Sequence, residues 1–192
     1  MSLDRKINRI QFLSGNSLKV IAVLTMLIDH LCKIVLQWLL SNYWGAMADN
    51  GQMSWERFRE IDYFIRFDLQ SIGTIAFPLF CFLLAEGFQH TRSKKRYIGL
   101  MLAFALISEV PFDIGFFSAY SRMEGTFPFY LKYQNVFFTL FLGLLTLVCL
   151  ERFSCKSDLP VDRIKSAVLQ VLSVVLFSGI AEGIHCDYGM QG

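Results

Sequence analysis

Residues 18–40 read LKVIAVLTMLIDHLCKIVLQWLL and decide the fold class, because this stretch is 23 residues long and mostly apolar. An α-helix of that length extends about 35 Å, which is enough to cross the hydrocarbon core of a bilayer. The run is too long for the apolar part of a signal peptide, and no small-residue cleavage site follows it. We therefore expect 18–40 to be an uncleaved first transmembrane span.

Three ionisable residues lie in the interior of this span, and a fourth lies at its start. Asp29 and His30 are near its middle, and Lys33 is one helical turn beyond Asp29, where the two can pair. Lys19 is eleven residues before His30, and eleven steps of about 100° bring the helix back to within about 20°, so both lie on one face. Charges at this depth mark a functional site or a structural cluster that holds helices together, and the spacing alone favours neither.

Composition supports a membrane protein. The mean hydropathy of the 192 residues is +0.45, and 54% of them are hydrophobic. We expect an all-α, polytopic helical membrane protein that forms a single transmembrane domain over 1–192. The net charge of +2 does not indicate a nucleic-acid partner. The five cysteines lack a C-x-x-C pair and the three histidines lack ligand spacing, so we expect free thiols and no metal.

Four further apolar runs complete a pattern of about five spans, and Pro78 and Pro111 predict a kink or break in two of them. Between the first two spans, residues 54–70 alternate apolar and charged positions at helical spacing. This pattern predicts an amphipathic helix along the membrane surface, with docking to a partner as the alternative. The expected later spans are 72–88, 97–117, 134–150 and 164–184.

The third span contains two carboxyl groups four residues apart, Glu109 and Asp113. Because like charges at this spacing repel, either one of them takes a proton or a cation lies between them. Alternatively, Asp113 is a solvated helix end at the membrane surface. The fourth span opens with Gln134 and Asn135, whose amides can cap the helix or bind a substrate, capping being the simpler role.

The distribution of cations predicts the orientation. If the N-terminus and the second and fourth loops share one side, that side has twelve Lys and Arg residues, against five on the other. The positive-inside rule then places the N-terminus in the cytoplasm. The twelve are Arg5, Lys6, Arg9, Lys19, Arg92, Lys94, Lys95, Arg96, Arg152, Lys156, Arg163 and Lys165.

Several blocks of the sequence resemble the TraX family of bacterial membrane proteins, which is named for the F-pilin acetylase of conjugative plasmids. The matching blocks are LKVIAVLTMLIDH (18–30), IGTIAFPLFCFLLAEGFQHTR (72–92), LISEVPFDIGF (106–116), QNVFFTLFLGLL (134–145) and DYG (187–189). Lys19 and His30 also resemble a first-helix pattern of the membrane acyltransferases that modify surface sugars. Family members continue past the DYG block with further hydrophobic helix, so we expect C-terminal helices to be missing from this chain.

The resemblance implies an acetyl-CoA-dependent acyltransferase in the bacterial cytoplasmic membrane. Its acyl acceptor would be a pilin-like protein N-terminus or a surface glycan. His30 is the implied base or acyl relay, oriented by Asp29, Glu109 or Asp113. The donor's phosphates would lie near three cations, Lys19, Arg92 and Lys95.

Two other functions fit the same residues. Buried Asp, Glu and His beside proline-broken helices are also typical of a small proton-linked transporter, although no internal repeat is evident. In a non-catalytic assembly factor for pilus or conjugation machinery, the polar cluster would be structural, and His30 would tolerate a neutral isostere such as Gln.

Overall fold

The computed structural model describes residues 14–155, 157 and 159–188, and these are helical apart from turns and one isolated bridge between Gln134 and Cys186. The expected all-α fold is confirmed. Within the described ranges, four helical runs are long and apolar enough to cross a membrane, so the chain is a polytopic helical membrane protein. These runs are Gly15–Asp49, Trp55–His90, Lys94–Glu124 and Pro160–Gly183. The cations Arg5, Lys6, Arg9 and Lys156 and the last residue of the DYG block, Gly189, lie outside the described residues.

The first run begins at Ser14, whose hydroxyl accepts a hydrogen bond from the backbone N–H of Ser17 and so caps the helix. Regular α-helix and wider π-helical turns then alternate to its end. In order they are α2 (Gly15–His30), η1 (Leu31–Leu36), α3 (Gln37–Leu39), η2 (Leu40–Trp44) and α4 (Gly45–Asp49). The helix therefore continues past the predicted end at residue 40 to Asp49. Residues 41–49 contain no proline, and the chain turns only at Gly51.

The second run also differs from the predicted division. It consists of α5 (Trp55–Tyr63), η3 (Phe64–Leu69), α6 (Gln70–Thr74) and α7 (Ala76–His90). Residues 54–70 are thus continuous with the apolar helix at 72–88, and their position at the membrane surface stays a prediction. The one interruption is Ile75, directly after Thr74. Pro78 has no N–H to donate to the carbonyl of Thr74, four residues before it, and its ring crowds that carbonyl. Pro78 therefore explains the interruption.

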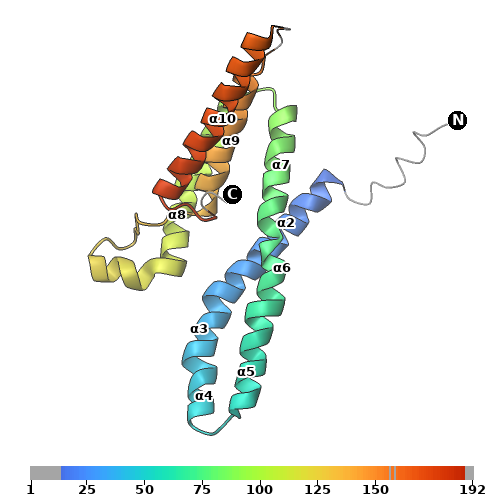
Figure 1. The fold of residues 1–192 in the computed structure, drawn as a ribbon. Coiled ribbons are helices and arrows are strands. Elements are labelled where there is room, and N and C mark those ends of the chain that lie inside the picture. Colours follow the sequence, from blue (N-terminus) through green and yellow to red (C-terminus); the bar gives the residue numbers. More distant parts are fainter. Residues whose placement is uncertain (1–13, 156, 158, 189–192) are drawn as a thin grey trace, which may run out of the picture. The chain divides into compact units, whose positions relative to one another are not determined.

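Three helices follow. They are α8 (Lys94–Glu124), α9 (Val136–Arg152) and α10 (Pro160–Gly183). The predicted break at Pro111 was wrong, since α8 continues through it to Glu124 and changes direction in its later part (Figure 1). With 17 residues, α9 extends about 26 Å, near the lower limit for a membrane span.

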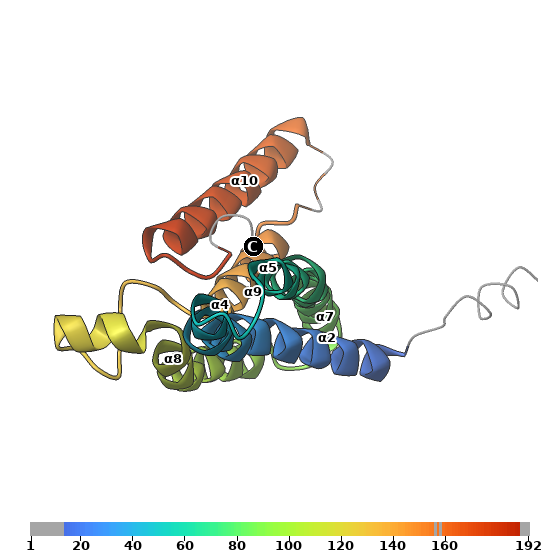
Figure 2. The ribbon, with the colours of Figure 1, turned by 90° about the horizontal axis from the view of Figure 1, so that it is seen from below.

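The chain divides into two compact units, residues 1–83 and 84–192. In the first unit, the two runs form a helical hairpin whose turn carries Gly51 in the left-handed region at φ 71° (Figure 1). Seen from below, α4 and α5 lie next to each other at this turn (Figure 2). Cys32, Leu40 and Ile65 form the buried core of the hairpin.

In the second unit, α9 packs against both α8 and α10. Leu142, Ala181 and Cys186 form a buried cluster where α9, α10 and the segment after α10 meet. That segment is held by two backbone hydrogen bonds: the N–H of Gln134 donates to the carbonyl of His185 at 3.1 Å, and the N–H of Asp187 donates to the carbonyl of Gln134 at 2.8 Å. The C-terminal segment is thereby fixed beside the first residues of α9.

Candidate functional site

A buried ion pair lies in the first unit, where α2 crosses α6. The side chain of Asp29 is 4% exposed, and its Oδ2 atom lies 2.8 Å from the Nζ atom of Lys33, as the i, i+4 spacing predicts. The other oxygen, Oδ1, is buried and has no hydrogen-bond partner among the described residues. Gly73 of α6 faces Asp29 so closely that a Cβ atom there would be 2.5 Å from the Cβ atom of Asp29. Glycine at 73 is therefore what lets the two helices meet at the carboxylate.

His30 is adjacent to this pair but on a different side of α2. Its Nδ1 atom lies 2.9 Å from the backbone carbonyl of Met26 and 3.9 Å from the Oδ2 atom of Asp29. Because a carbonyl only accepts hydrogen bonds, Nδ1 carries the proton in this contact. In the neutral ring the lone pair is then on Nε2. The side chain is 37% exposed, so the imidazole combines a fixed tautomer with access from outside the helix.

Lys19 is exposed on the same regular α-helix as His30. Eleven residues of α-helix separate the two Cα atoms by about 17 Å along the axis, within about 20° of one face. The helix thus keeps the alignment that the spacing predicts.

A second polar centre lies in the second unit and contains Glu109, Asp113 and Asn135, all at most 6% exposed. The amide of Asn135 donates through Nδ2 to the Oε2 atom of Glu109 and, at 2.9 Å, to the carbonyl of Ala105. The Oδ2 atom of Asp113 accepts a hydrogen bond from the backbone N–H of Tyr130 at 2.7 Å. Asp113 is completely buried, so the alternative of a solvated helix end was wrong.

In each of the two carboxyl groups, one oxygen lacks a hydrogen-bond partner among the described residues. Glu109 Oε1 and Asp113 Oδ1 are buried and have no hydrogen-bond partner within the described part of the chain. A buried polar atom without a hydrogen bond destabilises the folded protein. Such atoms are therefore uncommon, and a functional role is one reason for their presence. The centre is therefore a candidate for proton exchange or ligand contact.

The C-terminal segment makes polar contacts with residues before and within the first turns of α9. The hydroxyl of Tyr133 donates to Asp187 Oδ1 at 3.1 Å, and Thr139 donates to the backbone carbonyl of Asp187. Burial, followed by the nearby charge of Asp187, raises the pKa of the Tyr133 hydroxyl to about 12. Burial raises the pKa of the Cys186 thiol to about 11. Both groups are therefore neutral at physiological pH.

Two residues in this segment adopt positive φ angles that side chains other than glycine rarely take. They are His185 at 52° and Tyr188 at 65°, on either side of Asp187. Left-handed backbone at such residues is uncommon and often accompanies functional sites. Nothing in the spacing of the sequence predicted this, although the DYG block pointed to the segment.

Two of the three cations expected to bind the donor lie around the turn between α7 and α8. Arg92 and Lys95 are exposed there. Lys94, between them in the sequence, pairs instead with Glu151 and lies 4.4 Å from the ring centre of Phe88. Lys19, Arg92 and Lys95 have no ion pair with any described residue, so all three can bind an anionic ligand.

The predicted site residues are divided between the two units. Lys19, Asp29 and His30 belong to the first unit, whereas Arg92, Lys95, Glu109 and Asp113 belong to the second. No cluster of three or more His, Cys, Asp or Glu residues able to hold a metal occurs in the described residues. Asn135, Tyr133 and Cys186 were not among the predicted site residues.

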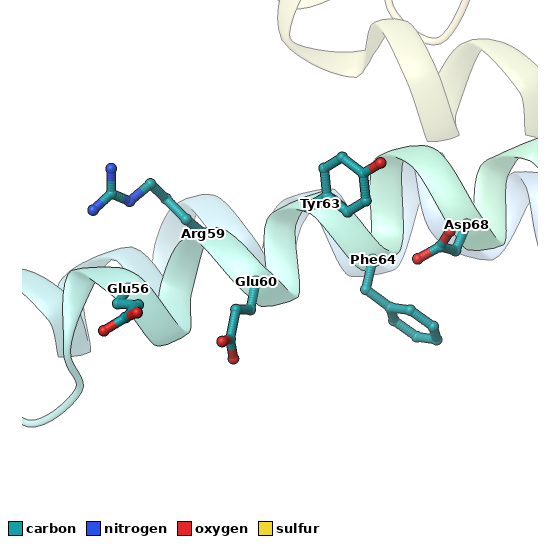
Figure 3. Close-up of a pocket in the computed structure, with 6 residues that line it drawn as sticks. All are labelled: Glu56, Arg59, Glu60, Tyr63, Phe64 and Asp68. Carbon is teal, nitrogen blue, oxygen red and sulfur yellow. The ribbon is translucent and has the colours of Figure 1, made fainter.

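A concave region on α5 and η3 is a poor candidate for a binding site. Its lining residues all come from one helix and point to different sides of it, so no second wall encloses a ligand (Figure 3). They are Glu56, Arg59, Glu60, Tyr63, Phe64 and Asp68.

Comparison with known protein families identifies the family of this chain. The family model described as TraX protein matches residues 14–192. The chain belongs to the TraX family. This confirms the resemblance of the sequence blocks, and the matched range includes all seven predicted site residues.

The chain is also similar to a protein of Dichelobacter nodosus named probable fimbrial assembly protein FimC, serogroup H1. The two are 29% identical over 181 residues, which cover 92% of this TraX family chain and 57% of the relative. The chain therefore spans little more than half the length of this curated relative. No solved structure matches the chain.

Proposed function

We propose that this TraX family protein is an integral membrane acyltransferase that moves an acetyl group from acetyl-CoA to a pilin-type protein N-terminus or a surface glycan. The observation that carries the proposal is the 2.9 Å contact between Nδ1 of His30 and the carbonyl of Met26. Because the carbonyl only accepts, this contact favours the tautomer with the proton on Nδ1 and the lone pair on Nε2, as a general base requires.

In the simplest mechanism, Nε2 of His30 accepts the proton of the acceptor amine or hydroxyl. The acceptor atom forms a bond to the thioester carbonyl carbon, and the carbon–sulfur bond of the donor breaks. His30 then gives the proton to the leaving thiolate. In the relay form, Nε2 attacks the thioester carbonyl carbon and the carbon–sulfur bond breaks, which releases the thiolate. The acceptor then attacks the acetyl-imidazolium, His30 leaves as the neutral ring, and the acceptor's proton passes to the thiolate.

Asp29 supports His30 by charge. Its Oδ2 atom is 3.9 Å from the ring, close enough to favour the imidazolium that forms during transfer. Lys33 holds the same carboxylate at 2.8 Å and prevents it from becoming an uncompensated buried charge. Glu109 and Asp113 are proposed as further catalytic carboxyl groups, because each keeps one unpaired buried oxygen.

Acetyl-CoA would be the donor substrate, and exposed cations of the chain suit its phosphates. Lys19, Arg92 and Lys95 are exposed and have no ion pair with the described residues. We place all three on the cytoplasmic side, with the N-terminus in the cytoplasm of a bacterium. Reporter fusions in the turns at 50–54 and 91–93 test this orientation, because the proposal requires opposite sides for these two turns.

The test of function is incubation of membranes containing the protein with labelled acetyl-CoA, followed by separation of protein and glycolipid. Label that requires His30 supports the acyltransferase, and the labelled fraction identifies the acceptor class. Lys95→Ala should raise the KM for acetyl-CoA and leave kcat nearly unchanged. Absence of transfer by a folded protein would contradict the proposal.

The relative named as a probable fimbrial assembly protein favours one second candidate, a non-catalytic assembly factor. His30→Gln separates the two, because glutamine keeps a neutral hydrogen-bonding side chain but cannot act as the base. An assembly factor should keep supporting fimbriae with glutamine at position 30, whereas the acyltransferase should lose acetyl transfer.

A further inference from the structure

We propose that Asn135 is a positioning residue, which fixes the Glu109 carboxyl group so that its proton is carried on Oε1. This inference rests on the proposed function. It goes beyond it by assigning a role to a residue outside the helix that contains the carboxyl pair.

Every hydrogen-bonding group of the Asn135 side chain is already used. Nδ2 donates to Glu109 Oε2 and to the carbonyl of Ala105, and Oδ1 accepts from the backbone N–H of Phe137 at 2.9 Å. The Oδ1 contact caps α9, which confirms the capping role expected from the sequence. With both donors occupied, the amide has none left to offer to a substrate.

Glu109 is held at one oxygen only. The backbone N–H of Asn135 also donates to Oε2, at 3.4 Å. The backbone and the side chain of Asn135 therefore both donate to the same oxygen of Glu109. Oε1 is buried without a partner in the described part of the chain. The rotation of the carboxyl group is therefore fixed, and Oε1 is the oxygen that remains to carry a proton.

The charged surroundings of Glu109 are consistent with a proton rather than a permanent counter-ion. Asp113, one turn along α8, is bonded through Oδ2 to the N–H of Tyr130 and likewise keeps Oδ1 unpaired. From the C-terminal segment, Cys186 interacts electrostatically with Glu109 and with Asp187. Asp187 itself accepts the hydroxyl of Tyr133. No cation pairs with Glu109 or Asp113 among the described residues.

Capping and positioning can be separated, because they need different atoms of Asn135. Serine and aspartate cap helices about as well as asparagine. Serine is too short to donate to Glu109, and aspartate has no donor and adds a negative charge. Asn135→Ser and Asn135→Asp should therefore keep the start of α9 and release Glu109. Asn42→Ser is a matched control, because Asn42 is exposed and its amide bonds only the carbonyl of Trp38.

The experiment measures two properties in each variant, in detergent or membranes. The first is the kinetics of acetyl transfer, and the second is the infrared band of the protonated Glu109 carboxyl group, assigned by its loss in Glu109→Gln. We expect both Asn135 variants to lower kcat about 10- to 100-fold, with the KM for acetyl-CoA within about twofold. The Glu109 band should shift in both, while thermal stability stays close to that of wild type in Asn135→Ser.

Wild-type kcat together with an unmoved Glu109 band would overturn the inference, as would a loss of kcat that follows only a loss of thermal stability. If the wild-type protein transfers no acetyl group, the proposed function fails. The infrared band still decides then whether Asn135 positions Glu109, so the two failures remain distinguishable.

Discussion

The substitution Gly73→Ala tests the closest helix contact in the first unit. A Cβ atom at position 73 would be 2.5 Å from the Cβ atom and 2.8 Å from the Cα atom of Asp29. Carbon atoms in contact normally lie about 3.5–4.0 Å apart, so α6 must move away from α2 by at least about 1 Å. The backbone of α2 contributes part of the clash, and rotation of a side chain cannot relieve it.

Overpacking of this kind costs about 1–3 kcal/mol in the free energy of unfolding. The assay is reversible unfolding in mixed micelles, followed by circular dichroism. Gly179→Ala is the control, because a Cβ atom at position 179 of α10 meets nothing within 4 Å. Alanine there should stabilise the helix by about 0.5–1 kcal/mol, since glycine is the poorer helix former.

The functional consequence follows from the same geometry. Separation of α2 from α6 disturbs Asp29, which holds Lys33 and lies near His30, so Gly73→Ala should also lower acetyl transfer. If Gly73→Ala is as stable as wild type, while Gly179→Ala shows the expected gain, the close approach of the two helices at Asp29 is refuted.

Two further predictions concern buried groups. Lys33→Met leaves the Asp29 carboxylate buried without its cation and should cost about 3 kcal/mol. The double variant Asp29→Asn, Lys33→Met should lose less than the sum of the losses of its two single variants. A loss equal to that sum would show that the two residues are not coupled. Cys186, with a pKa of about 11, should react with iodoacetamide at pH 8 roughly 100-fold more slowly than an ordinary thiol, judged against the same protein in denaturing detergent. Rapid labelling of native Cys186 would contradict its burial.

The sequence was sufficient to predict local features. The length and apolarity of 18–40 predicted a membrane helix, the i, i+4 spacing predicted the pairing of Asp29 with Lys33, and Asn135 was expected to cap α9. These features depend on residues within one helix or at its end, where the backbone geometry fixes which side chains meet. The same local logic, applied to Pro111, failed because α8 accommodates the proline within a continuous helix.

Contacts between segments far apart in the sequence could not be predicted. Nothing in the spacing shows that Gly73 faces Asp29, or that Asn135 reaches the carboxyl group of Glu109. The fixation of Asp187 by Gln134 and Tyr133 depends on the path of the chain after α10. Such contacts depend on how the helices pack against each other. The size of a side chain on one helix does not tell which residue of another helix lies opposite it.

The central claim, that His30 is the base or acyl relay of an acetyl transfer reaction, is tested most directly by comparing two histidine variants in one assay. His90 is the matched control, because its Nδ1 atom lies 2.9 Å from the carbonyl of Glu86, the same local contact that His30 makes with Met26. Initial rates of acetyl transfer from labelled acetyl-CoA should fall at least about 100-fold in His30→Ala and stay within about twofold of wild type in His90→Ala. Equal rates in the two variants, with both proteins folded in the membrane, would contradict the account.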